Sequence, residues 1–294
     1  GATIGGIVAA NSSGPRRLKY GTVRDIIIGI TVVLADGTVA KAGGKVVKNV
    51  AGYDLGKLFT GSLGTLGVIA TANFRLHPLP ETARTVAVEV ETPQAAQDAA
   101  QAIVHSQVEA TAVELHWSAE TRLVSVLLES IPGGIEAKEE AATFLLKPFG
   151  DVRTLTDDEG QNLGPLAPPA NATGDDGAIK VAAPPAELAS VLDSILGAGE
   201  RKGVAVRLTG HAGTGVTYAG LSGDADAIVE VIEEVRDIRN RGGGSVVVLS
   251  APITVKEKLD VWGPAGDYLG LTRRVKEKFD PGYAMNPGRF IGGI

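Results

Sequence analysis

The stretch GKVVKNVAGYDLGKLFTGSLGTLGVI, from Gly44 to Ile69, decides the fold that we expect for the first part of the chain. It contains six glycines, one short amphipathic helical segment and an apolar exit into a strand. Asp54 is a suitable N-cap, because its side chain can accept the free amide protons of the first helical turn. The apolar residues that follow fall on one face at helical spacing, and Gly61 suits the left-handed position that ends a helix.

Gly61, Gly64 and Gly67 then follow one another at every third position. Glycine at this density lets a backbone approach a ligand closely and point several amides at it. Alone, the spacing is more typical of ordinary turns. It is not a Walker phosphate loop, since no Lys-Ser or Lys-Thr pair follows. It is not a Rossmann fingerprint either, because the glycines follow a helix and lead into a strand.

Longer strings give a more specific signal. The chain opens with GATIGG at residues 1–6, carries KNVAGYDL at 48–55 and GSLGTLGVI at 61–69, and ends with NPGRF at 286–290. With these strings the chain resembles the FAD-linked oxidases of the vanillyl-alcohol oxidase type, which have a PCMH-type FAD-binding domain. Within that group it is most similar to the E subunit of bacterial glycolate oxidase.

The resemblance implies an α+β fold class, with the second half of a PCMH-type FAD-binding domain and an antiparallel-sheet cap domain. We expect residues 1–80 to form that half-domain and residues 81–268 the cap. Residues 269–294 would be a C-terminal helix and a tail that returns to the FAD domain. The upstream glycine-rich loop that takes the pyrophosphate in the family is missing from this chain, so we expect the front half of the FAD domain to be absent.

Residue patterns alone predict much of this architecture. Residues 25–42 read as a hairpin with a tight turn at Asp36-Gly37. Residues 86–146 and 179–250 read as two successive β-α-β-β-α units, which predicts a ferredoxin-like pseudo-repeat. Between them, residues 151–176 are rich in Gly, Pro, Asp and Asn, and we expect a mobile excursion there. A basic helix is predicted at 269–279.

The resemblance also names the residues that we expect to contact FAD. The candidates are Thr3, Gly5, Gly6, Asn11, Ser12, Gly64, Thr65, Gly67, Val68 and Ile69, with Asn286 and Arg289 added from the tail. Without the resemblance, the glycine pair near the N-terminus would indicate a tight helix–helix contact, and the polar residues after it would indicate a turn. The basic residues Arg16, Arg17, Lys19 and Arg24 form either a solvated face or a contact with an anionic group.

A second string bears on the chemistry. Resembling catalytic subunits carry Gly-His-x-Gly-x-Gly-x-x-His and a later Glu-His pair, which can hold a metal that clamps a hydroxy acid. This chain keeps the first histidine as His211 but has Tyr218 at the second position, and residues 246–254 lack the Glu-His pair. A phenol is a far poorer ligand for a divalent metal. We therefore predict no metal site, a hydrogen-bonded role for His211 in a βαβ turn, and no catalytic residue that the sequence can name. Leu63 also stands where many relatives have a glutamate.

Bulk composition excludes several classes. The formal net charge of -6 argues against a nucleic-acid surface. The 294 residues contain no cysteine, so they cannot bind an iron–sulfur cluster or zinc through thiolates.

The resemblance implies an FAD-binding subunit of a glycolate oxidase complex, which oxidises glycolate to glyoxylate. Electrons would pass to an iron–sulfur subunit, and a sister FAD-binding subunit would be the catalytic partner. It also implies a cytoplasmic location, at the inner face of the membrane through partners. Two alternatives stay open: a stand-alone FAD-linked dehydrogenase for D-lactate or another 2-hydroxy acid, and a non-catalytic flavin-binding scaffold.

Overall fold

The computed structural model describes residues 1–44, 53–156, 159 and 177–294, and the chain divides into two compact units. Unit 1 comprises Gly1–Ser13, Tyr20–Pro78 and Pro264–Ile294, and unit 2 comprises Gly14–Lys19 and Leu79–Gly263. The KNVAG part of the quoted KNVAGYDL string, residues 48–52, lies outside the described residues.

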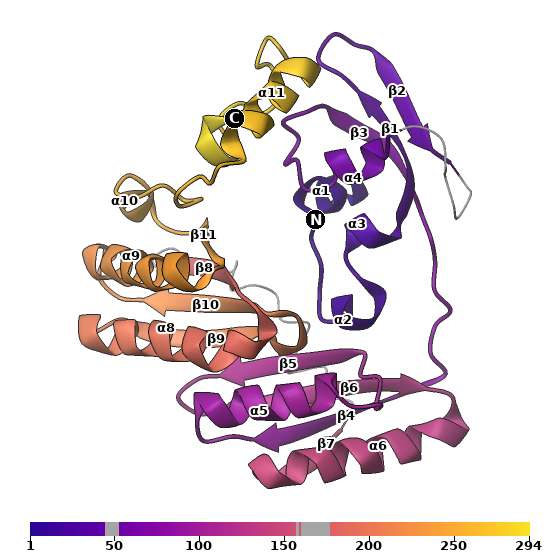
Figure 1. Ribbon diagram of the computed structural model, residues 1–294, viewed down its shortest axis with the longest axis vertical. Coiled ribbons are helices and arrows are strands. Elements are labelled where there is room, and N and C mark those ends of the chain that lie inside the picture. The colour runs from indigo at the N-terminus through magenta and orange to yellow at the C-terminus, as the bar shows by residue number, and fades with distance from the viewer. Residues whose placement is uncertain (45–52, 157–158, 160–176) are drawn as a thin grey trace. The chain divides into compact units, whose positions relative to one another are not determined.

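Unit 1 contains a three-stranded antiparallel sheet in the order β2-β1-β3 (Figure 1). Its elements are α1 (Ile4–Ala10), α3 (Val23–Ile26), β1 (Ile27–Val33), β2 (Val39–Gly43), α4 (Leu55–Phe59), β3 (Val68–Phe74), α11 (Leu269–Phe279) and η4 (Ile291–Gly293). The predicted hairpin is confirmed: β1 and β2 are joined by a turn in which the carboxylate of Asp36 accepts the amide of Thr38 at 2.9 Å.

The helix predicted after Asp54 is also confirmed. The Asp54 side chain accepts the amide of Lys57 at 3.2 Å, and Gly61 has φ +83° just beyond the helix end. Phe59 of this helix is fully buried in the small core of unit 1, where its ring meets that of Phe279 edge-on at 5.5 Å. Helix α11 therefore packs on the same core as the N-terminal strands.

Unit 2 is built on an eight-stranded antiparallel sheet in the order β11-β8-β10-β9-β5-β6-β4-β7. Its first repeat holds β4 (Thr82–Glu89), α5 (Pro93–Val104), β5 (Ala112–Trp117), β6 (Arg122–Ser130), α6 (Pro132–Leu146), η1 (Lys147–Phe149) and β7 (Val152–Leu155). Its second repeat holds β8 (Gly177–Ala182), η2 (Pro185–Glu187), α8 (Leu188–Lys202), β9 (Ala205–His211), η3 (Ala212–Thr214), β10 (Val216–Ser222), α9 (Ala225–Gly242) and β11 (Ser245–Ser250). Helix α10 (Ile253–Lys256) follows, and α2 (Arg17–Tyr20) begins in unit 2 and ends in unit 1.

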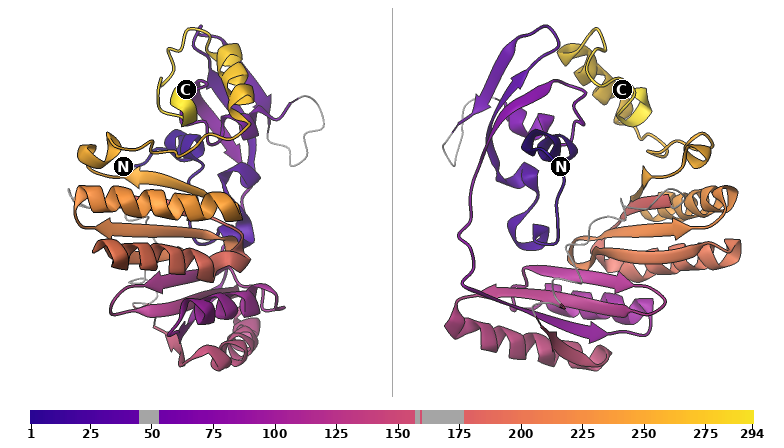
Figure 2. Two further views of the ribbon diagram at one scale, coloured as in Figure 1. Left: turned by 60° about the vertical axis from the view of Figure 1, so that its left-hand side comes forward. Right: turned by 180° about the vertical axis from the view of Figure 1, so that it is seen from behind.

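The pseudo-repeat is visible in the strand order. Within each repeat the strands take the order fourth, first, third, second, and the two second strands, β9 and β5, pair antiparallel where the repeats join. Helices α5, α6, α8 and α9 cover one face of the sheet (Figures 1 and 2). The ferredoxin-like expectation is thus confirmed.

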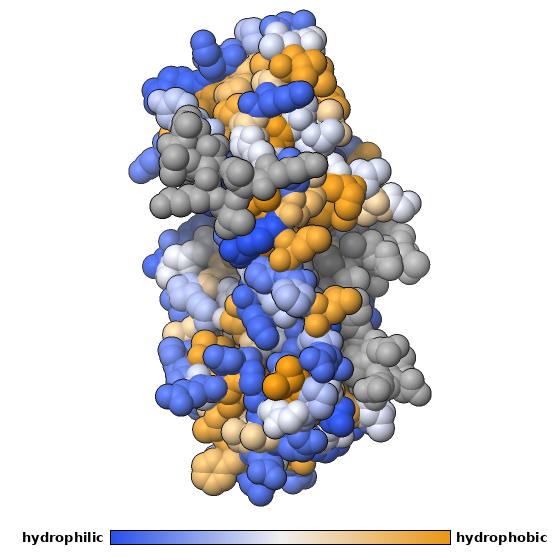
Figure 3. Space-filling view, turned by 90° about the vertical axis from the view of Figure 1, so that its right-hand side faces the viewer, coloured by the Kyte–Doolittle hydropathy of each residue, from blue (hydrophilic) through white to orange (hydrophobic). Residues whose placement is uncertain are grey.

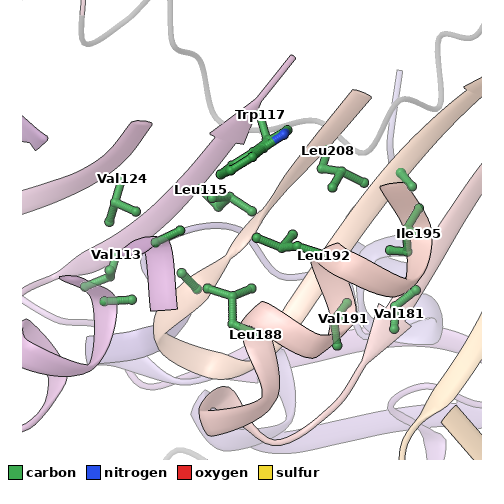
Figure 4. Packing of buried hydrophobic residues seen from close by; sticks show 14 of the residues in the cluster. Val113, Leu115, Trp117, Val124, Val181, Leu188, Val191, Leu192, Ile195 and Leu208 are labelled. Carbon is green, nitrogen blue, oxygen red and sulfur yellow. The ribbon is translucent and has the colours of Figure 1, made fainter. Parts of the chain in front are cut away.

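Alternation along the strands separates a core face from a second face. Val113, Leu115 and Trp117 of β5 are buried beside Leu192 of α8 and Leu208 of β9, as Figure 4 shows. The residues between them on β5 must point to the opposite face, because side chains alternate in a strand.

One expectation is wrong. The polar segment 151–176 was predicted to be a mobile excursion, yet Val152–Leu155 is strand β7, paired with β4 from Thr85 to Val88. Its own sequence, VRTL, is too short to show a pattern, so pairing with a neighbouring strand decides its structure. Of the rest of that segment, the structure describes Asp151, Thr156 and Glu159.

Within the described residues, no helix is long and apolar enough to cross a bilayer. On the face drawn in Figure 3, hydrophobic and hydrophilic residues are interspersed.

Candidate functional site

The glycine-rich loop, Gly61–Gly67, is held in an unusual backbone conformation in unit 1. Gly61, Leu63 and Gly64 all have positive φ, at 83°, 54° and 77°. For a leucine this region costs on the order of 1 kcal/mol, so its surroundings must hold it. The amide of Leu63 donates to the carbonyl of Ala9 at 2.8 Å, and the carbonyl of Leu63 accepts Nδ2 of Asn286 at 2.5 Å. The N-terminal helix and the C-terminal tail therefore both fix the loop.

A buried lysine holds the other side of this loop. Nζ of Lys276, in α11, is fully buried and donates to the carbonyl of Thr65 at 2.7 Å, Oδ2 of Asp280 at 2.6 Å and the carbonyl of Met285 at 2.9 Å. An ammonium group has three donors, so each has a partner. Asp280 in turn accepts the amides of Ala284 and Met285 at 3.0 and 2.7 Å. We call Lys276 and Asp280 the loop anchor.

Helix α1 brings the first predicted residues against this region. The hydroxyl of Thr3 accepts the amide of Gly6 at 3.1 Å and caps the helix. A Cβ on Gly5 would lie 3.4 Å from the carbonyl oxygen of Ile69, so the helix approaches β3 closely at this glycine. Without the resemblance, the residues predicted a helix–helix contact here; the partner of the glycine is strand β3 instead.

Two further predicted residues use their polar groups within the protein. Oδ1 of Asn11 accepts the amide of Arg24 at 3.3 Å, and the Thr65 hydroxyl donates to the carbonyl of Ser62 at 2.7 Å. Asn11 also has φ +47° at the end of α1. In this structure these side chains shape the backbone around the loop.

The two glycines at the end of the loop differ in what surrounds them. A Cβ on Gly67 would lie 2.8 Å from the carbonyl of Val33, so packing alone requires glycine there. A Cβ on Gly64 would meet nothing nearer than Nδ2 of Asn286 at 3.6 Å. The loop is thus preset in conformation and open at Gly64, and in that respect its residues fit one wall of a flavin site.

The remaining predicted residues lie nearby but make fewer contacts. Val68 is 57% exposed, and the side chains of Ser12 and Arg289 are exposed as well. The amide of Arg289 donates to the carbonyl of Asn286 at 3.3 Å, which joins it to the loop through the tail. The structure therefore brings α1, the loop, β3 and Asn286 together, with Arg289 at their margin.

A pocket of about 280 Å³ borders the loop. It is lined by Leu58, by five residues of the segment from Thr60 to Leu66, and by residues of α11 and the tail. Ligand pockets usually measure about 300–1,000 Å³. This pocket is therefore too small to hold a dinucleotide by itself.

Unit 2 offers a second polar region, on the sheet face opposite the helices. His116, Thr209, Tyr218 and Lys180 are successive cross-strand partners on β5, β9, β10 and β8. Partners in register point to the same face. Glu114 and His211, each two residues along its strand from this row, share that face. We call these six residues the polar face.

Glu114 and His211 form a buried pair on this face. Nδ1 of His211 lies 2.9 and 3.0 Å from the two carboxylate oxygens of Glu114, and the side chains are 1% and 9% exposed. The predicted hydrogen bond of His211 is confirmed, but the residue ends strand β9, which pairs antiparallel with β10, and does not lie in a βαβ turn. The ring of Tyr218 stands edge-on to the imidazole at 5.7 Å. Nε2 of His211 is buried and has no partner among the described residues.

Burial shifts the pKa values of four residues on the polar face. It raises the pKa of Glu114, against the opposing hydrogen bond from His211 and the charge of Arg17. It lowers the pKa of His116 to about 4. It lowers the pKa of Lys180, helped by the like charge of Arg17, and it raises that of Tyr218. The face therefore presents neutral and cationic groups around one buried carboxylate.

Arg16, in the basic cluster near the N-terminus, pairs with a carboxylate of the chain itself. Nε of Arg16 lies 2.8 Å from Oε1 of Glu129, which is buried in unit 2. Arg17 lies close enough to the polar face to act on the pKa values of three of its residues. Residues 14–19 thus belong structurally to unit 2.

Two important features escaped sequence reasoning. The loop anchor could have been found from the Lys-x-x-x-Asp spacing across the end of the last helix. Glu114 carried another, a carboxylate inside an otherwise apolar strand. Among the described residues, no group of three or more His, Cys, Asp or Glu side chains could hold a metal ion.

Comparison with known families agrees with the sequence resemblance. Residues 1–43 match the FAD binding domain family, and residues 79–156 match the family of FAD linked oxidases, C-terminal domain. Glycolate oxidase subunit GlcD of Bacillus subtilis (strain 168) is 47% identical over 107 residues, covering 36% of this chain and 23% of that protein. D-lactate dehydrogenase of Archaeoglobus fulgidus is 45% identical over 91 residues, covering 31% and 20%. Glycolate oxidase subunit GlcE of Escherichia coli (strain K12) is 39% identical over 100 residues, covering 34% and 29%.

The matched stretches thus span less than a third of each relative's length. Among solved structures, an alkyldihydroxyacetonephosphate synthase has a TM-score of 0.67 at 19% identity, covering 98% of this chain and 59% of that one. A glucooligosaccharide oxidase of Acremonium strictum has a TM-score of 0.63 at 15% identity, covering 96% and 69%. At these identities the likeness concerns the fold, and it confirms the expected fold class.

Proposed function

Because the chain carries part of the FAD-binding domain and part of the C-terminal domain of the FAD-linked oxidases, we propose that it is an FAD-binding subunit of a glycolate oxidase complex. The complex oxidises glycolate to glyoxylate and passes the electrons to an iron–sulfur partner. The observation that carries this proposal is the preset glycine-rich loop, tied to α1 through Leu63 and to α11 through Lys276.

The residues proposed to hold FAD lie on α1, the loop, β3 and the tail. FAD, when bound, supplies the acceptor for the hydride that leaves the substrate carbon. The chain's contribution on this side is positional. Gly64 leaves space for close approach, and Asn286 and the loop anchor keep the backbone from rearranging.

These 294 residues lack two features that the proposed reaction needs, and partner subunits would supply them. They have no cysteine with which to ligate a cluster, so a cluster that accepts electrons would have to sit on another chain. The metal string is broken at Tyr218, so the metal clamp of resembling catalytic subunits would have to come from a sister flavoprotein. Other subunits of the complex can supply both the cluster and the metal clamp.

The test is dye reduction with glycolate and with D-lactate. The FAD-loaded protein is assayed alone and then with its co-expressed neighbours, and we expect turnover only in the second case. Rapid turnover by the isolated protein would refute the subunit assignment and favour a stand-alone dehydrogenase, a second candidate that the D-lactate dehydrogenase relative supports. Absence of flavin from the protein purified with its partners would instead favour a scaffold.

A further inference from the structure

Helix α6 has an outward face that the described residues of unit 2 leave uncovered. The helix stands at the end of the row of four that covers the sheet, next to α5 (Figures 1 and 2). Its inward side chains, Ile135, Ala142 and Leu146, are buried against the sheet, whereas Phe144 is 74% exposed. A single exposed apolar residue needs no explanation, but Phe144 belongs to a continuous apolar stripe.

The stripe runs along the whole outward side of the helix. At 3.6 residues per turn its members fall on one side, and all are exposed: Gly133, Ala137, Ala141, Phe144 and Pro148, the last just beyond the helix end. Only one of them is a large side chain. A Cβ on Gly133 would meet no atom within 4 Å, so the surface is open there. Small residues let a second helix approach to about 8 Å.

The positions of the large and small residues make this face complementary to itself. Phe144 and Ala137 are seven residues apart, about 10.5 Å along the helix axis. Suppose that a second copy of α6 lies antiparallel, with the two-fold axis between positions 140 and 141. Phe144 of each copy then faces Ala137 of the other, and Pro148 faces Gly133. Such an interface uses the same patch on both subunits.

Charges beside the stripe favour the same antiparallel arrangement. Glu136 lies in the first half of α6 and Lys147 directly after its end, and both are exposed. Neither forms an ion pair with any of the described residues, whereas Lys138 of the same helix pairs with Glu109. Antiparallel helices place Lys147 of each copy beside Glu136 of the other. Parallel helices would place like charges side by side, which is unfavourable.

We propose that α6 is a self-association surface, through which two copies of this chain pair as antiparallel α6 helices. The Phe144 ring of each copy covers the small residues of the other, and the two Lys147–Glu136 pairs flank the contact. This inference uses only residues of unit 2 and is independent of the flavin site and of the proposed function. A pair of single helices buries less than a standard interface, so we expect a weak dimer with a Kd of about 10 µM.

The first test is sedimentation velocity of the full chain from about 1 µM to about 200 µM, which brackets that Kd. We expect a shift from monomer to dimer over this range. Phe144→Glu should raise the Kd about tenfold or more, because it removes the central aromatic anchor and adds a charge to the contact. Leu79→Glu is the matched control, since Leu79 is 92% exposed in unit 2 and outside the stripe.

A charge exchange tests the direction of the helices. Lys147→Glu places a carboxylate beside Glu136 of the second copy and should weaken the dimer. Adding Glu136→Lys to the same chain restores opposite charges at both contacts and should return the Kd close to that of the wild type. Both positions are exposed, so neither change disturbs the core.

A disulfide tests the register. The chain has no cysteine, so an introduced one can pair only with its counterpart in a second copy. Ala141→Cys lies beside the two-fold axis and should form a covalent dimer under mild oxidation. Gly133→Cys is the matched control, because its two copies would be about 22 Å apart along the axis, and a disulfide needs Cα atoms within about 7 Å.

Three results would overturn the proposal. The chain stays monomeric over the whole concentration range, or it forms a dimer that Phe144→Glu does not weaken, or Gly133→Cys cross-links as readily as Ala141→Cys. If the chain is monomeric and Phe144→Glu abolishes co-purification with its co-expressed neighbours, the face binds a different subunit and self-association is refuted.

Discussion

Each of the two units buries a hydrogen-bonded pair of titratable side chains, and the two pairs differ in how many of their polar atoms have partners. In unit 1, all three donors of Lys276 have acceptors, and Asp280 receives two further amides. In unit 2, Glu114 and His211 satisfy each other at Nδ1, but Nε2 has no partner among the described residues. A closed network of this kind stabilises one backbone arrangement. An open one leaves a buried polar atom without a hydrogen bond, which costs free energy.

The largest effect is expected from breaking the closed pair. Lys276→Met leaves the Asp280 carboxylate buried without its cation, which costs about 3–5 kcal/mol. We expect the peptide covering the glycine-rich loop to exchange its amide hydrogens much faster, as measured by hydrogen–deuterium exchange mass spectrometry. The exposed Lys278→Met is the matched control.

A double variant sharpens this result. Lys276→Met with Asp280→Leu removes both charges and should recover a large part of the lost protection, since an apolar pair of similar size is tolerated. Unchanged exchange in the single variant would show that the anchor does not hold the loop.

The next largest effect is expected from a substitution at a glycine of unit 2. Gly215, just before β10, has φ +69°, and a Cβ there would lie 1.9 Å from the carbonyl of Ala183. Strain and backbone overlap together predict that Gly215→Ala lowers the free energy of unfolding of unit 2 by about 2 kcal/mol or more. Urea unfolding followed by tryptophan fluorescence measures this, because both tryptophans are in unit 2. A loss below about 0.5 kcal/mol would mean that the turn relaxes easily.

The two pairs should also respond oppositely to pH. Burial alone would raise the pKa of Asp280, but the hydrogen bonds from Lys276, Met285 and Ala284 outweigh it and hold the pKa below its ordinary 3.8. Its stabilisation is therefore complete above that value and is lost as the pH falls through the lowered pKa. Burial raises the pKa of Glu114 above its ordinary 4.5, so its ionisation costs stability as the pH rises through the raised value.

Urea unfolding from about pH 3 to about pH 7 checks these signs. The stability difference between wild type and Asp280→Asn should grow with pH and then level off. The difference between wild type and Glu114→Gln should shrink as the pH rises. The same sign for both variants would contradict the opposite directions of the two pKa shifts.

The smallest effect is expected at the open side of the loop. Gly64 has φ +77° with room for a Cβ, so Gly64→Ala should cost only about 1 kcal/mol of backbone strain. If FAD approaches the loop at this residue, the same methyl group weakens FAD binding in the holoprotein by more than this strain explains. Equal FAD affinity in wild type and variant, by fluorescence titration, would place the cofactor elsewhere.

Local sequence predicted the elements better than the contacts between them. The hairpin, the two β-α-β-β-α units and the helix after Asp54 follow from alternation, turn residues and capping, which act over a few positions. The Lys276–Thr65 and His211–Glu114 contacts join residues 211 and 97 positions apart, and no local pattern encodes such a pairing. Strand β7 was missed for the same reason, because its partner strand lies far back in the chain.

The central proposal is that this chain belongs to an FAD-containing complex that oxidises glycolate. The direct test is anaerobic reduction of bound FAD in the complex assembled with its co-expressed neighbours, followed by loss of the flavin's visible absorbance. We predict rapid loss with glycolate and none with acetate. Flavin that stays oxidised with both glycolate and D-lactate would contradict the proposal.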